Sequence, residues 1–214
     1  MNIEDIFSRP KHSIWDNEVP IVTSETGDIT AYISDEIGDP FLYNELCHKL
    51  RAAPDGATVT LHINTPGGRL DAAFMIVDAI KAAKSKVISH LVGTVASAGT
   101  IIALASDELT LADHLTFMIH NYSSSGVQGK GHELKAYQEF SDKNLNNAFM
   151  DFYAGFLTTK EMEEVIDGRD LWLGKDQVAL RWAKRKSFLA DKTPFETAAE
   201  VISAKKRGRP RKDS

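Results

Sequence analysis

The chain has 214 residues, of which 43% are hydrophobic and 26% charged, which suits one well-buried soluble domain rather than two large ones. No stretch approaches the roughly 18 uninterrupted apolar residues of a membrane span, and the early residues lack the basic segment and apolar run of a secretory signal, so we expect a cytoplasmic protein. The net charge of −5 conceals a basic tail over residues 205–214; the remaining body is therefore more acidic than the total, which argues against a broad nucleic-acid groove.

Strand and helix signals alternate through the first part of the chain, after a polar leader over residues 1–28. Alternating and β-branched segments predict strands, and apolar residues at spacings of three and four predict amphipathic helices. The second strand ends at Gly67 and Gly68, which follow a proline and suit neither strand nor helix interior. The single cysteine, Cys47, lies among leucines and is expected to be a buried core residue. The predicted elements are strands over residues 29–33 and 57–63 and helices over residues 41–50 and 70–84.

The same alternation continues through the second part. An apolar strand is followed by a segment of small residues, residues 93–99, and then by a largely apolar helix. Two further strands, a loop over residues 121–131 and a long helix come next. Thr158 with Glu161 has the spacing of a capping box and predicts the start of one more short helix. The predicted elements are strands over residues 87–92, 108–112 and 115–119 and helices over residues 100–104, 133–156 and 158–166.

This order of strands and helices predicts an α/β fold with right-handed crossovers. In such sheets, reactive groups gather just beyond the carboxyl ends of the strands. Three residues of catalytic interest occupy that position in the predicted order, namely Gly68, Ser97 and His120. We therefore expect them to lie near one another at a single edge of the sheet.

Ser97 is the candidate nucleophile, because it falls where a strand passes into a helix N-terminus. A serine hydroxyl needs a base to take its proton and fixed donors for the oxyanion that it forms. Small neighbours allow a substrate carbonyl to approach, and the helix start directs N–H groups at negative charge. The flanking sequence lacks the first glycine of the hydrolase motif G-x-S-x-G. Taken alone, Ser97 could equally be a helix N-cap, and the pair of glycines a tight turn.

A base and an orienting acid would complete such a site. Of the seven histidines, His120 alone follows an apolar strand into a loop at the predicted active edge. A carboxylate must then orient the imidazole and stabilise its cation. Asp170, which precedes three apolar residues and is expected to be partly buried, is one candidate, and Asp167 is its rival. Periodicity does not choose between the two.

Four short motifs in order resemble those of the ClpP family, the proteolytic subunits of Clp proteases, across roughly residues 29–189. The first is I-N-T-P-G-G, ending at Gly68, and the second is G-T-V-A-S-A-G around Ser97. The third is M-I-H, ending at His120, and the fourth is G-R-D-L-W-L around Asp170. The spacing also matches, although Ala98 stands where the family usually has methionine and residues 121–125 replace its usual Gln-Pro.

The resemblance implies a serine endopeptidase with Ser97 as nucleophile, His120 as general base and Asp170 as orienting acid. It implies an oxyanion hole made by the backbone N–H groups of Gly68 and Ala98. It also implies a ClpP/crotonase-like α/β fold, with heptameric rings that stack face to face as a tetradecamer and the long helix over residues 133–156 as part of the inter-ring handle. A Clp-type ATPase is an expected partner. Divergent relatives of this type include phage and prophage peptidases, some of which process capsid proteins without an ATPase.

The resemblance divides the chain into a polar leader (1–28), a peptidase domain (29–190) and a C-terminal extension (191–214). The extension contains Arg207, Gly208, Arg209 and Pro210, which resemble the core of an AT-hook that binds narrow A·T minor grooves. The alternative for this tail is a solvated charge run. No G-x-x-x-x-G-K-[ST] nucleotide motif occurs, and we expect neither a cofactor nor a metal. Any ATP dependence would come from the partner.

Three other readings of the sequence remain open. A crotonase-like acyl-CoA enzyme would use the same kind of oxyanion hole but no serine nucleophile. A catalytically silent ring would act only as a scaffold. A Ser-Lys peptidase similar to signal peptide peptidase A would use a lysine as base, for which Lys130 and Lys143 are candidates. The first two predict that Ser97 has no chemical role, and the third predicts that His120 has none.

Overall fold

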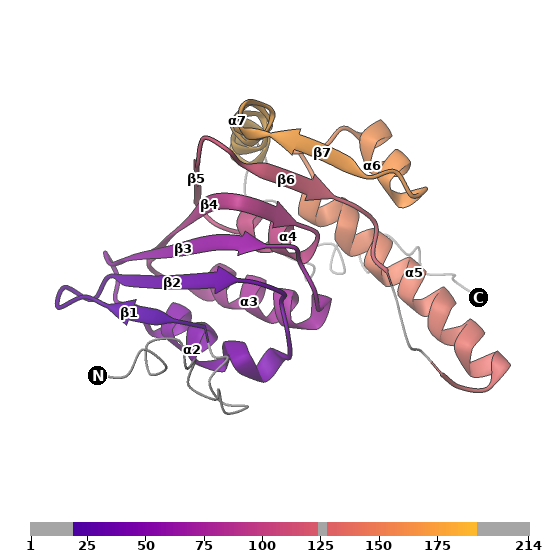
Figure 1. The fold of residues 1–214 in the computed structure, drawn as a ribbon, viewed down its shortest axis with the longest axis horizontal. Coiled ribbons are helices and arrows are strands. Elements are labelled where there is room, and N and C mark those ends of the chain that lie inside the picture. Colours follow the sequence, from indigo (N-terminus) through magenta and orange to yellow (C-terminus); the bar gives the residue numbers. More distant parts are fainter. Residues whose placement is uncertain (1–18, 124–127, 192–214) are drawn as a thin grey trace, which may run out of the picture.

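The computed structural model describes residues 19–123 and 128–191 and confirms the α/β class (Figure 1). Its sheet has seven strands in the order β1-β2-β3-β4-β6-β7, with β5 also paired to β4. The interior pairings from β2 to β6 are parallel, and the two edge pairings, β1 with β2 and β6 with β7, are antiparallel. The strands are β1 (Ile21–Thr23), β2 (Ile29–Ser34), β3 (Thr58–Thr65), β4 (Lys86–Ala96), β5 (Glu108–Leu111), β6 (Thr116–Ile119) and β7 (Leu171–Gly174).

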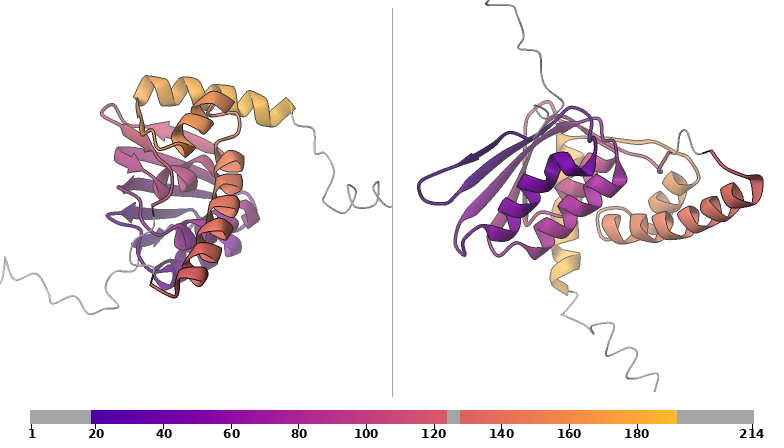
Figure 2. Two further views of the ribbon diagram at one scale, coloured as in Figure 1. Left: turned by 90° about the vertical axis from the view of Figure 1, so that its right-hand side faces the viewer. Right: turned by 90° about the horizontal axis from the view of Figure 1, so that it is seen from below.

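The helices are η1 (Pro40–Tyr43), α2 (Asn44–Ala52), α3 (Leu70–Ala82), α4 (Ala98–Leu104), α5 (Gly131–Tyr153), α6 (Thr159–Ile166) and α7 (Lys175–Asp191). Helices α2 and α3 pack on one face of the sheet (Figure 2). Alternate residues of β2 and β3 are therefore buried, whereas Tyr32, on the other face, is exposed. Cys47 is buried in α2, as the sequence predicts. The core thus lies between the sheet and these helices.

Strand β4 changes its partner along its length. Its first half pairs with β5, and its last three residues pair with β6. The change follows Gly93, whose φ of +62° is a conformation that favours glycine. A Cβ atom there would lie 2.9 Å from Oδ1 of Asn64, and the same oxygen accepts a 3.1 Å hydrogen bond from the N–H of Thr94. This irregularity extends β4 beyond the predicted residue 92 and carries the chain directly to Ser97.

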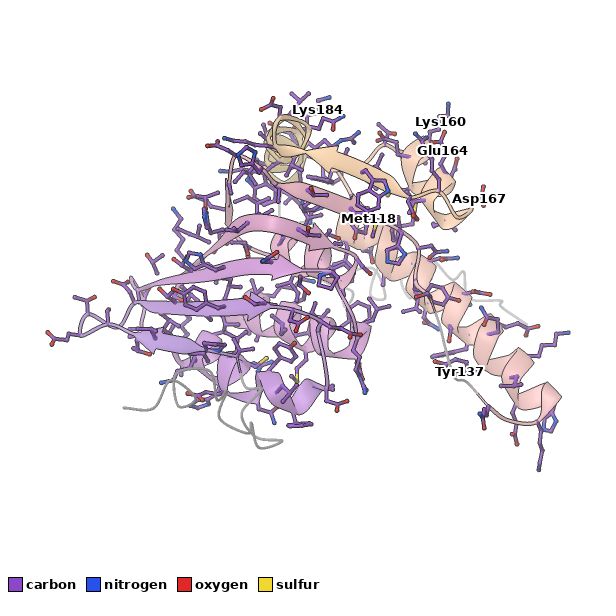
Figure 3. All side chains as sticks on the ribbon, viewed as in Figure 1. Met118, Tyr137, Lys160, Glu164, Asp167 and Lys184 are labelled. Carbon is purple, nitrogen blue, oxygen red and sulfur yellow. The ribbon has the colours of Figure 1, made fainter. Side chains whose placement is uncertain are left out.

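Helix α5 projects away from the sheet, so that its N-terminal part stands clear of the body (Figures 1 and 2). Only Ser141, Phe149 and Tyr153 are buried along its 23 residues. The large side chains of Tyr137 and Phe140 are exposed, and Figure 3 shows Tyr137 on the projecting part. The C-terminal end of α5 therefore belongs to the core, whereas the rest of the helix does not.

The last elements close the far edge of the sheet. Thr158 caps α6 in the predicted capping box. The N–H of Thr158 donates to the side chain of Glu161, and the N–H of Glu161 donates to the side chain of Thr158. Glu161 also forms a two-bond ion pair with Arg181 of α7, at 2.7 and 3.0 Å. Strand β7 and helix α7 were not predicted from sequence. Nor was β1, which lies within the stretch expected to be a polar leader.

Candidate active site

Ser97 occupies a strained turn between β4 and α4. Its φ of 52° and ψ of −124° are unusual for a residue with a side chain and cost about 1–3 kcal/mol. The turn is held from both sides, because its N–H donates to the carbonyl of Met118 on β6 at 2.9 Å and its carbonyl accepts from the N–H of Thr100, also at 2.9 Å. Although Ser97 occupies the N-cap position of α4, its hydroxyl makes no capping hydrogen bond. The hydroxyl is therefore not committed to the helix.

The segment containing Gly67 and Gly68 packs directly against this turn. A Cβ atom on Gly67 would lie 2.6 Å from Cβ of Ser97, and one on Gly68 would lie 2.3 Å from the carbonyl oxygen of Ile37. Ile37 fixes both sides of Gly68, since its N–H donates to the Gly67 carbonyl at 2.7 Å and its carbonyl accepts from Arg69 at 2.8 Å. Within the described residues, the N–H groups of Gly68 and Ala98 donate no hydrogen bond. Neither N–H is therefore committed to a protein acceptor in this part of the chain.

A cavity of about 70 Å³ brings four of the five predicted active-site residues together, whereas Asp170 does not line it. Gly68, Ser97, Ala98 and His120 all line it, as expected for groups that follow the carboxyl ends of neighbouring parallel strands. One wall is apolar. The side chains of that wall are Leu70, Phe74, Ile101, Leu145, Phe149 and Phe152.

The loop after His120 is anchored to two helices. The side-chain amide of Asn121 donates to the carbonyl of Ile166 at the end of α6, at 2.8 Å. The phenol of Tyr122 donates to Asp142 of α5, and Gln138 donates to both of these groups at 2.9 Å. The hydrogen bond to Asp142 is the main cause that raises the pKa of the Tyr122 phenol. Tyr122 also lines the cavity, a role that no sequence motif indicated.

His120 directly follows the last paired residue of β6 and Asp170 directly precedes the first paired residue of β7, but no hydrogen bond joins them in the described part of the chain. Strand β7 runs antiparallel to β6 with Leu171 opposite Ile119, so the next residues outward are Asp170 and His120. Asp170 is exposed, not partly buried as its apolar neighbours suggested, because β7 is an edge strand with Trp172 also exposed. No hydrogen bond joins Asp170 to His120, or His120 to Ser97, among those that the described residues form.

Asp167, the rival carboxylate, lies at the C-terminal end of α6 and is also exposed (Figure 3). It is three residues from Asp170 and is separated from β7 by Gly168, whose φ is +106°. The N–H groups of Asp167, Gly168 and Arg169 each donate to a carbonyl of α6. These bonds hold Asp167 to the helix end rather than to the end of β6.

The other candidate bases do not reach the cavity. Lys130 is exposed at the start of α5 and Lys143 is exposed on its side, and neither lines the cavity that holds Ser97. In the described part of the chain, no three His, Cys, Asp or Glu side chains are grouped to hold a metal ion, and no helix there is long and apolar enough to cross a membrane. The tail residues Arg207, Gly208, Arg209 and Pro210 lie outside the described residues.

Comparisons with known proteins agree with the four motifs. The family model described as Clp protease matches residues 26–177. The chain is 29% identical over 121 residues to ATP-dependent Clp protease proteolytic subunit 2 of Pseudomonas aeruginosa, covering 56% of this chain and 60% of that protein. It is 30% identical over 141 residues to the proteolytic subunit 1 of Chlamydia caviae, covering 63% and 69%. With subunit 1 of Protochlamydia amoebophila the identity is 31% over 150 residues, covering 66% and 71%.

Proposed function

Because the chain belongs to the Clp protease family, we propose that it is a serine endopeptidase in which Ser97 is the nucleophile, His120 the general base and Asp170 the residue that orients the imidazole. The observation that carries the proposal is the shared cavity. Ser97 and His120 line it together with Gly68 and Ala98, whose backbone N–H groups are free of protein acceptors among the described residues. A hydroxyl, a base and two free N–H donors on one cavity are the parts that acyl transfer requires.

The proposed reaction begins when the His120 imidazole takes the proton of the Ser97 hydroxyl as its oxygen attacks the scissile carbonyl. The oxyanion of the tetrahedral adduct accepts hydrogen bonds from the N–H groups of Gly68 and Ala98. The imidazolium then gives its proton to the leaving amine, which departs with the C-terminal part of the substrate. A water molecule, activated by the same imidazole, releases the acyl group and restores Ser97.

The cavity wall favours an apolar side chain next to the scissile bond. Phe74, Ile101 and Phe152 line the cavity together with Ser97, and Phe74 stacks on Phe152 with ring centroids 5.5 Å apart. Burial of an apolar group stabilises a complex by about 25 cal/mol per Å². We therefore propose that peptides with an apolar residue at the cleavage point are cleaved faster than those with a charged one.

The third catalytic residue is the least constrained part of the proposal. Asp170 would orient His120 after a local movement of the exposed edge formed by the ends of β6 and β7. We propose that assembly into a homo-oligomeric ring holds this edge in the position where Asp170 contacts His120. We also propose that a Clp-type ATPase is the partner of the ring. The printed names of the relatives describe ATP-dependent proteolytic subunits, and the projecting α5 offers the exposed Tyr137 and Phe140 to a second copy.

Labelling with a fluorophosphonate probe tests the proposal. The parent protein should form one covalent adduct, located at Ser97 by mass spectrometry, and should cleave an apolar peptide substrate. Ser97→Ala should abolish both while keeping the native mass of the assembly, because a methyl group replaces a hydroxyl that makes no structural hydrogen bond. A parent that is never labelled would favour the acyl-CoA enzyme or the silent ring, and full activity in Ser97→Ala would contradict the proposal.

A further inference from the structure

A buried chain of hydroxyl groups runs from the Ser97 carbonyl through Thr100 to Tyr153, a residue that also lines the cavity. The hydroxyl of Thr100 is 2.6 Å from the carbonyl oxygen of Ser97 and 2.5 Å from the phenolic oxygen of Tyr153. Thr100 is 0% and Tyr153 1% exposed, so water does not compete for these bonds. The chain joins the last residue of α5 to the first turn of α4, across 53 residues of sequence.

The direction of these hydrogen bonds follows from the groups themselves. A carbonyl oxygen can only accept, so the Thr100 hydroxyl must donate its single proton to Ser97. Its oxygen is then left to accept from the phenol of Tyr153. Burial raises the pKa of Tyr153, so the phenol retains the proton that it donates. The order is therefore Tyr153 O–H to Thr100 O–H to the Ser97 carbonyl.

The carbonyl that ends this chain belongs to the same peptide group as the N–H of Ala98. A peptide group is planar and trans, so its C=O and N–H point in opposite directions. A bond that fixes the direction of the Ser97 carbonyl therefore also fixes the direction of the N–H of Ala98, a residue that lines the cavity. Hydrogen bonds in series also polarise one another, which makes that N–H a stronger donor.

From this geometry we propose that Thr100 and Tyr153 are positioning residues, which aim and polarise the Ala98 N–H at the oxyanion that develops when Ser97 is acylated. The inference rests on the proposed function for its catalytic consequence. The Ser97 carbonyl already accepts from the Thr100 N–H at 2.9 Å, and the hydroxyl adds a second, shorter bond that fixes the plane of the peptide. The strained φ of Ser97 makes such a restraint necessary.

The far end of the chain is itself fixed. Arg185 of α7 donates to the carbonyl of Ala154 at 2.5 Å and to that of Leu104 at 3.4 Å, so one buried guanidinium joins the ends of α5 and α4. The ring of Tyr153 packs against Phe149 with centroids 4.5 Å apart. The phenol is thus held by its neighbours on both helices and cannot leave Thr100 without being buried unpaired, which would cost about 1–3 kcal/mol.

Three variants distinguish a role of the Thr100 and Tyr153 hydroxyls in positioning the Ala98 N–H from a role of these side chains in packing alone. Thr100→Val removes the hydroxyl and keeps the shape, Tyr153→Phe removes only the outer donor, and Thr100→Ser keeps the inner bond. We expect the rate constant for fluorophosphonate labelling to fall about tenfold in Thr100→Val, which is less than the loss of an entire oxyanion-hole donor, and severalfold in Tyr153→Phe. Thr100→Ser should label within about twofold of the parent. In peptide hydrolysis the loss should appear in kcat, with KM unchanged.

The double variant Thr100→Val with Tyr153→Phe distinguishes the loss of positioning from a loss of protein stability. It leaves no buried hydroxyl unpaired, which makes it close to neutral for folding, and it should label no faster than Thr100→Val because the two bonds act in series. The matched control is Ser89→Ala, which breaks the buried 2.7 Å hydrogen bond between Ser89 and Ser106 elsewhere in the core. It should lower the melting temperature and leave the labelling rate unchanged.

The amide resonance of Ala98, observed with ¹⁵N-alanine in the uninhibited protein, tests the same inference without any activity. The resonance should shift in Thr100→Val and in Tyr153→Phe and stay in place in Ser89→Ala. If the parent is never labelled while the Ala98 amide responds as stated, the proposed function fails and the positioning chain stands. A double variant that keeps both the parental Ala98 resonance and the parental labelling rate would overturn the inference.

Discussion

The two halves of the candidate site differ in how strongly the single chain constrains them. Around Ser97, buried hydrogen bonds from β6 and α4, together with the close contact of Gly67, fix a backbone that would otherwise relax. Around Asp170, the side chain is exposed at an edge strand and makes no hydrogen bond to His120. The proposed nucleophile and oxyanion donors are therefore preorganised within one chain, whereas the proposed pairing of His120 with Asp170 needs a further ordering step.

Asp170→Asn tests the less constrained half of the site, around Asp170, and we expect the largest effect from it. If the carboxylate orients the His120 imidazole during turnover, the amide should reduce kcat by about 10³ to 10⁴-fold, because it favours the wrong tautomer. The measurement is kcat for an apolar peptide in the assembled protein. Asp167→Asn, three residues away at the end of α6, is the matched control and should remain near the parental rate. A loss below tenfold for Asp170→Asn would mean that Ser97 and His120 act without it.

Gly68→Ala tests the stronger half. The new methyl group would lie 2.3 Å from the Ile37 carbonyl oxygen, at a φ of +143°, so the segment that presents the Gly68 N–H must move. We expect labelling of Ser97 to slow by about 10² to 10³-fold, the loss seen when one oxyanion donor is removed. Gly56→Ala is the control, because its φ of +88° imposes a similar backbone strain with nothing within 4 Å of the new atom. Equal labelling rates in the two variants would show that the Gly68 contact has no part in the reaction.

Acidification should destabilise helix α6, which precedes Asp170, before it destabilises helix α4, which follows Ser97. The Arg181 guanidinium, with further hydrogen bonds from Thr158, lowers the pKa of Glu161 in α6 to about 2. A lowered folded-state pKa contributes stability that is complete above the unfolded value of 4.5 and is lost as the pH falls from there towards 2. Because Glu161 is partly solvated, we expect only about 1–2 kcal/mol from it.

Hydrogen exchange between pH 5 and pH 3 measures this effect. Amides of α6 should lose protection in the parent, whereas those of α4 should keep it. Glu161→Gln should show weaker protection at pH 5 and little further change on acidification. Equal losses in α4 and α6 would contradict the separation of the site into two halves with different anchors.

The sequence predicted the strongly patterned part of the fold and missed the weakly patterned part. Strand β3, helix α3 and the turn at Ser97 have clear periodicity and a sharp break, and all three appear where expected. Strand β7 has three adjacent apolar residues instead of an alternating pattern, and α7 buries only Val178 and Arg185. Tertiary pairing rather than local pattern determines such elements.

Sequence reasoning predicted which candidate residues follow strand ends but not how those residues are held. Gly68, Ser97 and His120 follow strand ends, and that position alone placed them at one cavity. The contact between Thr100 and Tyr153 joins residues 53 positions apart, and no periodic signal marks a contact of that kind. The exposure of Asp170 depends on its place at the sheet edge, which three apolar neighbours in the sequence did not reveal.

The most direct test of the central claim is whether one reagent can bond to Ser97 and His120 at once. A peptidyl chloromethyl ketone with an apolar side chain should form a hemiketal between its ketone carbon and the Ser97 oxygen, and its methylene carbon should alkylate a ring nitrogen of His120 with loss of chloride. We predict a His120 adduct, located by mass spectrometry, that is lost in Ser97→Ala and is accompanied by clear density joining the ketone carbon to Ser97 in a crystal of the inhibited protein. Alkylation of His120 at the same rate in Ser97→Ala, or of another histidine instead, would contradict the account.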